Sequence, residues 1–442
     1  MARFSTIFTA RNLLVLSVAF NATLLLRLFH ENRIGSLHGL YPVILNEGLE
    51  HRPPLSQRSR LTTAETSLLS SSAATAEENE DRVINLDHGD PTMYETYWRG
   101  MGDRTTIVIP GWQTMSYFSD TRNLCWFLEP KFAQQVVRLH KVVGNAVTEN
   151  HHIVVGTGSS QLIQAALYAL SPKDAMDPIP VVSTAPYYSS YPLMTDILKS
   201  RLHKWAGDAR SFKKSGPYIE FVTSPNNPDG FVRHSVVNQS EGMLVHDLAY
   251  YWPQYTPITS PAEHDLMLFT VSKCTGHAGT RIGWALVKDE QVAKRMVKFI
   301  ELSTIGVSRD SQLRAAQVLK VVSDSCESRE GGDSFFEYSY HLMDKRWKKL
   351  QEAVQQSEMF SMPHFPPQFC TFHKRIFKPQ PAFAWVKCEG DIEDCEGFFK
   401  EKKILVRSGK HFGDSLKLVR VSMMDRDQSF EVLLRRINSI QT

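Results

Sequence analysis

The chain has 442 residues, of which 42% are hydrophobic and 22% are charged, so it is long enough for two domains with a large buried core. This composition excludes a disordered or fibrous protein. The 50 basic and 47 acidic residues give a formal net charge of +3, and no long Lys/Arg block is present, so nucleic acid is not an expected partner. Small metabolites are the expected ligands.

Residues 1–33 differ from the rest of the chain because they contain an apolar stretch between arginines. Residues 13–26 are apolar apart from Ser17, Asn21 and Thr23. The stretch is shorter than the ~20 residues of a typical membrane-spanning helix, but no clean cleavage site follows it, so we favour an uncleaved signal anchor over a removed signal peptide. An endoplasmic-reticulum membrane protein is the first expectation, and a secreted or soluble protein is the second. Because basic residues flank the apolar stretch on both sides, the positive-inside rule does not predict its orientation in the membrane.

Residues 34–82 have the composition of a flexible linker. They include a Pro-Pro pair, a Ser/Thr/Ala-rich segment over 67–76 and an acidic run over 77–81. Few large apolar residues are present there to offset the entropy cost of ordering the chain. We therefore expect the folded enzyme to begin near Val83.

From Val83 onward, short apolar runs alternate with helical patterns, which predicts an α/β fold with a mostly parallel central sheet between helices. The strands expected in this sheet are 153–155, 180–183, 219–223, 243–245, 266–271 and 282–287, and a helix is expected over 160–170. Residues 83–305 are expected to form an N-terminal arm and the large domain. Residues 306–442 are expected to form a smaller α+β domain, with helices over 337–355 and 429–440 and strands over 382–386, 404–407 and 418–423.

The segment after the strand 266–271 has the composition of a cofactor site. Lys273 stands among Ser, Thr and Gly residues, and Arg281 follows before the next apolar run. Burial disfavours the ammonium form of a lysine, so that the neutral amine can attack an aldehyde. Small residues let backbone N–H groups approach an anion, which an arginine can bind in a bidentate fork. Pyridoxal 5′-phosphate offers both groups, whereas the alternative interpretation is an exposed lysine in a Gly-rich loop.

Polar residues also follow the other predicted strands, at the edge of a parallel sheet where ligands bind. Ser159 and Ser160 lie in a Gly-rich turn that opens a helix, which is a typical anion site. Further polar residues at successive strand ends are Tyr187, Tyr188, Asn226, Asn227, Asp247 and Tyr250. Any one of them has an ordinary explanation: Asn226 and Asn227 suit a plain turn, and Asp247 suits a helix cap or a core ion pair. Their joint occurrence with a lysine indicates one shared cofactor site.

These motifs resemble those of fold-type I pyridoxal-phosphate enzymes and, among them, the plant alliinase and tryptophan aminotransferase-related family. The resemblance covers roughly residues 83–440. It is carried by the segments that begin at Asn85 (NLDHGDPT), Met115 (MSYFSD), Val155 (VGTGSSQ), Thr223 (TSPNNPDG), His246 (HDLAYYWP), Ser272 (SKCTGHAGTRIGW) and Val419 (VRVSM). The segment from Lys273 to Arg281 is specific to the family.

The resemblance implies a fold-type I architecture and roles for individual residues. Lys273 would bind the cofactor covalently and, once displaced by substrate, carry the proton between Cα and C4′. Asp247 would pair with the pyridinium nitrogen, and Arg420 would bind the substrate α-carboxylate. The other implied cofactor contacts are Asn227 and Tyr250 at the ring hydroxyl, Tyr188 on the ring face, and Ser159, Ser160, Ser272 and Arg281 at the phosphate. Relatives also use a tyrosine of the neighbouring subunit at the phosphate, and Tyr117 matches its motif, which implies a homodimer.

The implied activity is transamination of L-tryptophan with a 2-oxo acid such as pyruvate, yielding indole-3-pyruvate for auxin synthesis. The alternative within the class is a C–S lyase acting on cysteine sulfoxides, as in alliinases, and it would use the same cofactor residues. Bulb alliinases carry a cysteine-rich EGF-like module, whereas residues 1–124 contain no cysteine, which favours the aminotransferase. A catalytically silent membrane-tethered scaffold is a third alternative, which the intact set of Lys273, Asp247, Asn227 and Arg281 weakens.

The six cysteines are scattered and form no C-x-x-C pair, so neither a zinc ribbon nor a dense disulfide framework is indicated. Cys388 and Cys395 could bridge locally in an oxidising compartment, but free buried thiols are the favoured interpretation. No third ligand stands at a useful spacing from His151 and His152, so no metal site is expected. Asn238 begins a glycosylation sequon that a lumenal domain could use.

Overall fold

The computed structural model describes residues 82–172, 176–328 and 334–440. The chain divides into the units Met1–Ser72 and Ala73–Thr442, and all of the described residues belong to the second. The predicted signal anchor and nearly all of the predicted linker therefore lie outside the described residues. Within the described ranges, each helix is too short or too polar to span a bilayer.

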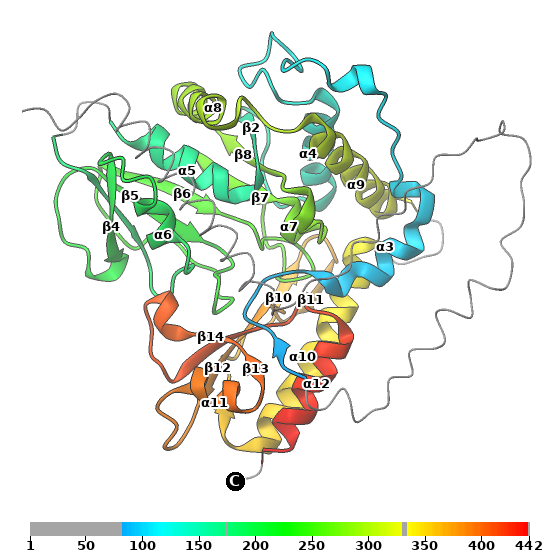
Figure 1. Ribbon diagram of the computed structural model, residues 1–442, viewed down its shortest axis with the longest axis vertical. Helices are drawn as coiled ribbons and strands as arrows, with labels where there is room; N and C mark the ends of the chain where they lie inside the picture. Colours follow the sequence, from blue (N-terminus) through cyan, green and yellow to red (C-terminus); the bar gives the residue numbers. More distant parts are fainter. Residues whose placement is uncertain (1–81, 173–175, 329–333, 441–442) are drawn as a thin grey trace, which may run out of the picture. The chain divides into compact units, whose positions relative to one another are not determined.

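A seven-stranded mixed sheet lies at the centre of the described part of the second unit (Figure 1). Its strands are β2 (His152–Gly156), β3 (Ile179–Ser183), β4 (His203–Asp208), β5 (Tyr218–Thr223), β6 (Gly242–Asp247), β7 (Leu266–Thr270) and β8 (Gly283–Val287). Their order is β2-β8-β7-β6-β5-β3-β4; β8 is antiparallel to both of its neighbours, β2 and β7, and the other pairs in this sheet are parallel. The predicted α/β fold with a mostly parallel sheet is confirmed.

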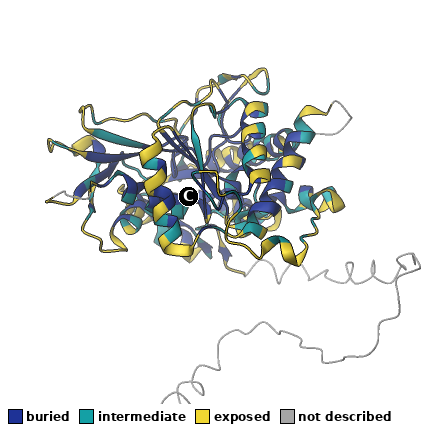
Figure 2. Cartoon of the chain, turned by 90° about the horizontal axis from the view of Figure 1, so that it is seen from above, coloured by how far each residue is buried: buried dark blue, intermediate teal, exposed yellow. Residues whose placement is uncertain are grey.

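The strands near the middle of this sheet are buried on both faces, as expected where helices cover a parallel sheet. Every residue of β5 and β7 is buried, which is why both read in the sequence as nearly continuous apolar runs. In Figure 2 the central strands are dark blue, whereas exposed residues follow the outer sides of the helices. The core of the protein therefore lies along this sheet.

Amphipathic helices pack around the sheet. They are α4 (Pro130–Val143), α5 (Gly158–Leu170), α6 (Tyr191–Asp196), α8 (Glu290–Thr304) and α9 (Arg309–Glu327). α5 contacts β7, β8 and α8, and α4 packs against α9. In α4 the buried residues Phe132, Val136, Leu139 and Val143 recur every three to four positions, the spacing of one helix face.

The C-terminal part of the chain is built around a four-stranded antiparallel sheet of order β14-β15-β12-β9. Its strands are β9 (Phe360–Ser361), β12 (Phe383–Cys388), β14 (Arg407–Ser408) and β15 (Leu418–Ser422). The helices of this part are α10 (Phe335–Ser357), α11 (Cys395–Glu401) and α12 (Asp427–Asn438), and α10 packs against α12. A separate hairpin consists of β10 (Gln368–Cys370) and β11 (Arg375–Phe377).

Short helical segments connect these elements. The α-helical ones are α3 (Glu95–Met101) and α7 (Val271–Cys274). The 3₁₀ turns are η1 (Thr92–Tyr94), η2 (Gly102–Thr105), η3 (Gly111–Thr114), η4 (Ala209–Ser211), η5 (Ala278–Thr280) and η6 (Gly409–Phe412).

The first described residues belong by their hydrogen bonds to the C-terminal part of the chain. β1 (Ile84–Asn85) pairs in parallel with β13 (Ile404–Leu405). The backbone N–H of Ser422 donates to the carbonyl of Leu86 over 2.9 Å. Local sequence carries no signal for a partner strand so far along the chain, so this pairing could not be predicted. The division near residue 305 stays a prediction, and α9, which follows it, packs against α4.

Cys388 and Cys395 form a disulfide, so the favoured interpretation of free thiols is wrong for this pair. Cys388 ends β12 and Cys395 begins α11, and the loop between them brings the two Cα atoms to 5.7 Å. Both residues are fully buried. Cys125, Cys274 and Cys370 are free and buried, as expected.

Candidate active site

One cavity of about 330 Å³ brings together every predicted site residue except Tyr117. Those in its lining are Ser159, Ser160, Tyr188, Asn227, Asp247, Tyr250, Ser272, Lys273, Arg281 and Arg420. Most of them follow the carboxyl ends of parallel strands, where ligands bind in open α/β sheets, and Arg420 comes from β15 of the C-terminal part. The volume suits a small organic ligand.

Lys273 lies on the one-turn helix α7, directly after β7. The helix begins because the hydroxyl of Thr270 accepts a hydrogen bond from the backbone N–H of Ser272 over 3.2 Å, which is a helix cap. Nζ of Lys273 donates to the carbonyl of Gly89 on the N-terminal arm. The lysine is therefore held between a strand end of the central sheet and the arm.

The surroundings of Lys273 disfavour its charged form. Burial lowers the pKa of Lys273 to about 8, and the guanidinium groups of Arg420 and Arg281 act in the same direction, while Asp90 opposes them. A substantial fraction of the amine is then neutral near physiological pH. This state is the one that can form a covalent bond with an aldehyde.

Asp247 ends β6 and is 5% exposed. Its Oδ2 accepts a hydrogen bond of 2.9 Å from the hydroxyl of Tyr191, and its Oδ1 accepts one of 3.2 Å from the N–H of Ala249. Burial raises the pKa of the Asp247 carboxyl, and these two hydrogen bonds oppose the shift. Both donors are neutral, so the buried carboxylate fits a ligand that offers a cationic ring nitrogen.

The opposite end of the site fits an anion. Ser159 and Ser160 stand in the first turn of α5, where unpaired backbone N–H groups and the helix dipole favour negative charge. Gly158 has φ +73°, and a Cβ there would lie 2.4 Å from Nη2 of Arg281, so only glycine leaves room for the guanidinium. Arg281 donates from Nη1 to the neutral carbonyl of Ala278 over 3.0 Å, which leaves its charge available.

Ser272 and Tyr188 complete the contacts predicted for the cofactor phosphate and ring face. Ser272 is 6% exposed, and its hydroxyl accepts a hydrogen bond of 3.1 Å from that of Thr270. The ring of Tyr188 meets that of Tyr191 edge to face, with centroids 5.3 Å apart. Both residues line the cavity, but their predicted contacts with the cofactor stay predictions.

Arg420 is 3% exposed in the middle of β15. It donates from Nη1 to Oδ1 of Asn227 over 3.1 Å and from Nη2 to the carbonyl of Asp87. Its guanidinium carbon lies 4.1 Å from the ring centroid of Phe383. Burial lowers the pKa of Arg420 to about 10. Among the described residues its buried Nε has no hydrogen-bond partner, which fits a guanidinium that awaits a carboxylate.

Tyr250 is buried beside these groups, and burial raises the pKa of its hydroxyl well above the usual value, with Arg420 opposing the shift. The hydroxyl is therefore a neutral hydrogen-bond donor. Together with Asn227 it fits the predicted partner of a ring hydroxyl oxygen.

Several functional candidates have no role predicted from the sequence. His88, Gly89, Phe383 and Arg407 also line the cavity, and Tyr191 lies behind Asp247. His88 and Gly89 belong to a motif that carries the family resemblance, which is the only signal that could have pointed to them. Arg407 binds the carboxylate of Asp87 with bonds of 2.5 and 3.2 Å, a contact between distant parts of the sequence.

Tyr117 does not line the cavity in the described chain, and it is 69% exposed. Its neighbours Trp112, Met115 and Phe118 are also exposed large apolar residues. The predicted contact from a neighbouring subunit stays a prediction.

Comparisons with known proteins show which family the chain resembles. The family model described as Allinase matches residues 84–441. Tryptophan aminotransferase-related protein 2 of Arabidopsis thaliana is 58% identical over 440 residues, which cover 97% of this chain and 96% of the relative. Tryptophan aminotransferase-related protein 1 of Oryza sativa subsp. japonica is 56% identical over 368 residues, covering 81% and 83%. Alliin lyase 1 of Allium sativum is 35% identical over 356 residues, covering 78% and 72%.

Solved structures show the same fold at low identity. The aspartate aminotransferase from Rhizobium meliloti has a TM-score of 0.59 at 16% identity, covering 88% of this chain and 99% of that one. An aminotransferase from Staphylococcus aureus has a TM-score of 0.57 at 17% identity, covering 84% and 98%. Pyridoxal phosphate is the cofactor of this fold; when bound, it supplies an aldehyde for amino groups and a ring that withdraws electrons from Cα. With a lysine, a buried carboxylate and an anion cradle that fit this cofactor, the chain belongs to the alliinase family of fold-type I pyridoxal-phosphate enzymes.

Proposed function

We propose that this protein is an aminotransferase that converts L-tryptophan and pyruvate to indole-3-pyruvate and L-alanine in auxin biosynthesis. The observation that carries the proposal is that Lys273 and Arg420 line one cavity. A guanidinium that holds the α-carboxylate and an amine that moves a proton at Cα are the two groups that transamination requires of the protein. The 58% identity to a tryptophan aminotransferase-related protein supports the choice of substrate.

The charged groups that the sequence predicted in this cavity have separate tasks in the proposed reaction. Arg420 binds and orients the amino acid, so that its Cα–H bond lies near the amine of Lys273. Lys273, with its lowered pKa, is a base of suitable strength for a proton at carbon. Asp247 keeps the ring nitrogen of the cofactor protonated. The Gly158 turn and Arg281 hold the phosphate in place throughout.

The test uses the full-length protein with two substrate pairs. Incubation with L-tryptophan and pyruvate is expected to give indole-3-pyruvate and L-alanine in equal amounts. A parallel incubation with an S-alkyl-L-cysteine sulfoxide measures the lyase alternative. Release of pyruvate from the sulfoxide, with no product from tryptophan, would overturn the proposal in favour of the lyase. Lys273→Ala is the matched control and should abolish both activities; if the wild type lacks the absorbance of bound cofactor, the scaffold alternative is correct.

We also propose that the protein is anchored in the endoplasmic-reticulum membrane through residues 1–33, with the catalytic part in the lumen. Two features of the described chain support a lumenal location of the catalytic part. The disulfide between Cys388 and Cys395 is of a kind that persists in oxidising compartments. Asn238 of the sequon is exposed in the segment before β6. Glycosidase treatment is expected to lower the mass of the wild type but not of Asn238→Gln; an unglycosylated wild type with reduced Cys388 and Cys395 would place this part in the cytosol.

We propose a homodimer in which Tyr117 reaches the phosphate site of the other subunit. The exposed apolar residues Trp112, Met115 and Phe118 around it support an interface. Tyr117→Phe is expected to weaken cofactor binding. Co-expression of Tyr117→Phe with Lys273→Ala tests the exchange, because mixed dimers would contain one site with both groups intact. Recovered activity in mixed dimers supports the proposal, whereas a monomeric protein or no recovery contradicts it.

A further inference from the structure

The N-terminal arm is tied to the C-terminal part of the chain on both sides of Gly89. On one side the N–H of Leu86 donates to the carbonyl of Leu405 over 2.8 Å. On the other side the N–H of Met93 donates to the carbonyl of Met424 over 2.9 Å. These backbone bonds fix the two ends of the arm.

Gly89 is the point of the arm that meets the reactive lysine. Its carbonyl accepts a hydrogen bond from Nζ of Lys273. A Cβ at this position would lie 3.1 Å from Nζ and 3.0 Å from the ring of Phe383, so the backbone is packed closely between the two. A carbonyl acceptor stabilises a protonated amine and fixes its direction. The orientation of the Gly89 peptide therefore influences where the Lys273 amine points and how readily it holds a proton.

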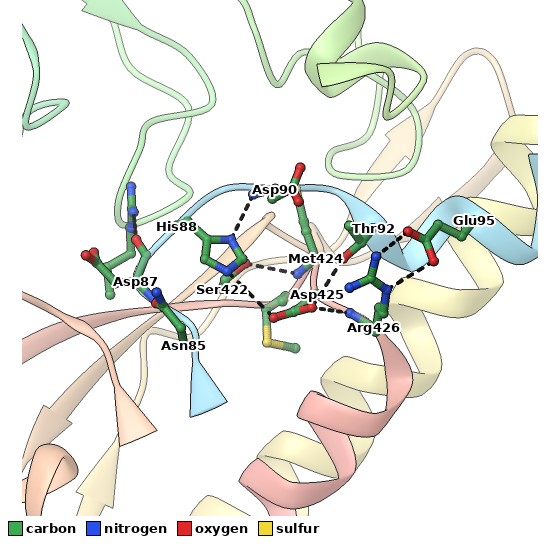
Figure 3. A network of polar contacts seen from close by, with 12 residues as sticks. Asn85, Asp87, His88, Asp90, Thr92, Glu95, Ser422, Met424, Asp425 and Arg426 are labelled. Carbon is green, nitrogen blue, oxygen red and sulfur yellow. Dashed lines mark hydrogen bonds and ion pairs between the residues drawn. The ribbon is translucent and has the colours of Figure 1, made fainter. Parts of the chain in front are cut away.

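His88 braces this part of the arm from within (Figure 3). Its Nδ1 accepts a hydrogen bond of 3.2 Å from the N–H of Asp90, which closes a turn around Gly89. A ring that accepts at Nδ1 carries its proton on Nε2. That nitrogen lies 3.7 Å from Oδ2 of Asp425, and Oδ1 of the same carboxylate accepts a hydrogen bond of 3.2 Å from the hydroxyl of Thr92. The imidazole thus lies between the Gly89 turn and a carboxylate that follows the end of β15.

We infer that His88 is a positioning residue: through its bond to Asp90 and its contact with Asp425, it holds the Gly89 carbonyl against the amine of Lys273. The inference rests on the proposed function in that Lys273 is the group that moves the proton. The side chain of His88 is 39% exposed, so its replacement leaves no large buried hole. Protonation of the ring would place two N–H donors, those of Nδ1 and Asp90, against each other. The brace therefore works with the neutral ring.

Three variants separate the parts of this brace. His88→Ala removes both contacts. His88→Asn keeps an acceptor near the position of Nδ1 and loses the contact with Asp425. Asp425→Asn keeps an acceptor for Thr92 and removes the negative charge opposite Nε2.

We expect His88→Ala to lower kcat by about tenfold to a hundredfold, because a misdirected catalytic group costs that much, with a smaller change in KM. The acidic limb of the kcat profile is expected to shift to lower pH, since Lys273 acts as a base in its neutral form and its amine loses an acceptor that favours its proton. His88→Asn is expected to bring kcat to within about fivefold of the wild type and to restore the pH profile, because the hydrogen bond with the N–H of Asp90 makes the main contribution. A His88→Ala enzyme with wild-type kcat and pH profile, or one that merely unfolds at lower temperature, would overturn the inference.

A second readout needs no amino-acid substrate. The pH-dependent absorbance of the cofactor-bound protein reports the proton at the Lys273 nitrogen. Its midpoint is expected to fall in His88→Ala and to return in His88→Asn. If the wild type does not transaminate tryptophan but these midpoints differ as expected, the proposed function fails and the role of His88 stands. Equal midpoints in all variants would refute that role even in an active aminotransferase.

Discussion

The hydroxyl of Tyr191 donates a hydrogen bond of 2.9 Å to Oδ2 of Asp247, and it lies 2.6 Å from Oγ1 of Thr223. The Tyr191 ring is fully buried and stacks on Phe221 with centroids 4.5 Å apart. This neutral donor orients the Asp247 carboxylate without cancelling its charge. Burial raises the pKa of Asp247, and the bond from Tyr191 counteracts that shift. The tyrosine therefore helps to keep the carboxylate ionised for the cofactor nitrogen.

Tyr191→Phe is expected to weaken cofactor binding by about tenfold, because a hydrogen bond to a charged group contributes roughly 1.5 to 3 kcal/mol and the bond from Ala249 remains. Titration of cofactor-free protein with pyridoxal phosphate measures the Kd. Tyr218→Phe is the matched control, since Tyr218 is equally buried but donates to the carbonyl of Val237 away from the cavity. Unchanged cofactor affinity in Tyr191→Phe would contradict the role.

Lys273 should make the cofactor-free protein more stable as the pH rises above neutrality. Its pKa is about 8 when folded but about 10.4 when unfolded, so the unfolded state binds more protons between these values. Below about pH 8 the folded state bears the full cost of the buried charge. The free energy of unfolding of Lys273→Met is therefore expected to exceed that of the wild type by about 1 to 3 kcal/mol at pH 7, and by less at pH 9.5. Urea unfolding at both pH values measures this, and a constant difference would argue against the lowered pKa.

Gly158→Ala is expected to impair phosphate binding, because φ of +73° is strained for alanine and its Cβ would lie 2.4 Å from Nη2 of Arg281. The left-handed conformation alone costs about 1 to 2 kcal/mol. The measurements are thermal stability and the Kd of pyridoxal phosphate, and both should worsen. Gly100→Ala is the control: it lies within α3 with no atom within 4 Å of the new Cβ, and it should stabilise by about 0.5 to 1 kcal/mol.

Arg420→Ala should raise KM for L-tryptophan by about a hundredfold or more, since it removes a charged partner of the α-carboxylate worth about 3 kcal/mol. The absorbance of bound cofactor should persist. Arg420→Lys should recover little, because an ammonium cannot reproduce two parallel N–H donors. Loss of the bound cofactor in Arg420→Ala would instead show that its bond to Asn227 supports the cofactor rather than the substrate.

Replacement of both Cys388 and Cys395 by serine is expected to lower the free energy of unfolding by about 2 kcal/mol, the value for a short closed loop. Both sulfur atoms are buried, so mild reductant should leave the folded wild type unchanged. Guanidinium unfolding with and without reductant measures the effect. Equal midpoints for the wild type and the double variant would contradict a stabilising disulfide.

The parallel core and the principal cofactor residues could be predicted because their signals are local. Strands such as β5 and β7 are continuous apolar runs, and the polar residues after them meet at one edge for geometrical reasons. β4 could not be found in this way. It contains Lys204, Gly207 and Asp208, which do not resemble a buried strand, and it lies at the end of the sheet.

The role of the arm could not be predicted, because its contacts join residues that are far apart in the chain. Asp87 and Arg407 are separated by 320 positions, and the sequence around either residue does not indicate that the other is its partner. Tyr191 was missed for a similar reason: it stands in a short helix, and only the fold brings its hydroxyl to Asp247. The disulfide was missed because spacing alone does not distinguish two nearby thiols from a bridge.

The pairing of β1 with β13 has a consequence for synthesis on the ribosome. The strand that receives β1 follows the whole central sheet in the chain, so the segment bearing Gly89 has no docking surface until β13 has left the exit tunnel. The nascent enzyme would therefore stay inactive, with its lysine uncovered, until β13 emerges. A protein truncated before β13 should fail to assemble a working catalytic centre even where the central sheet has already folded.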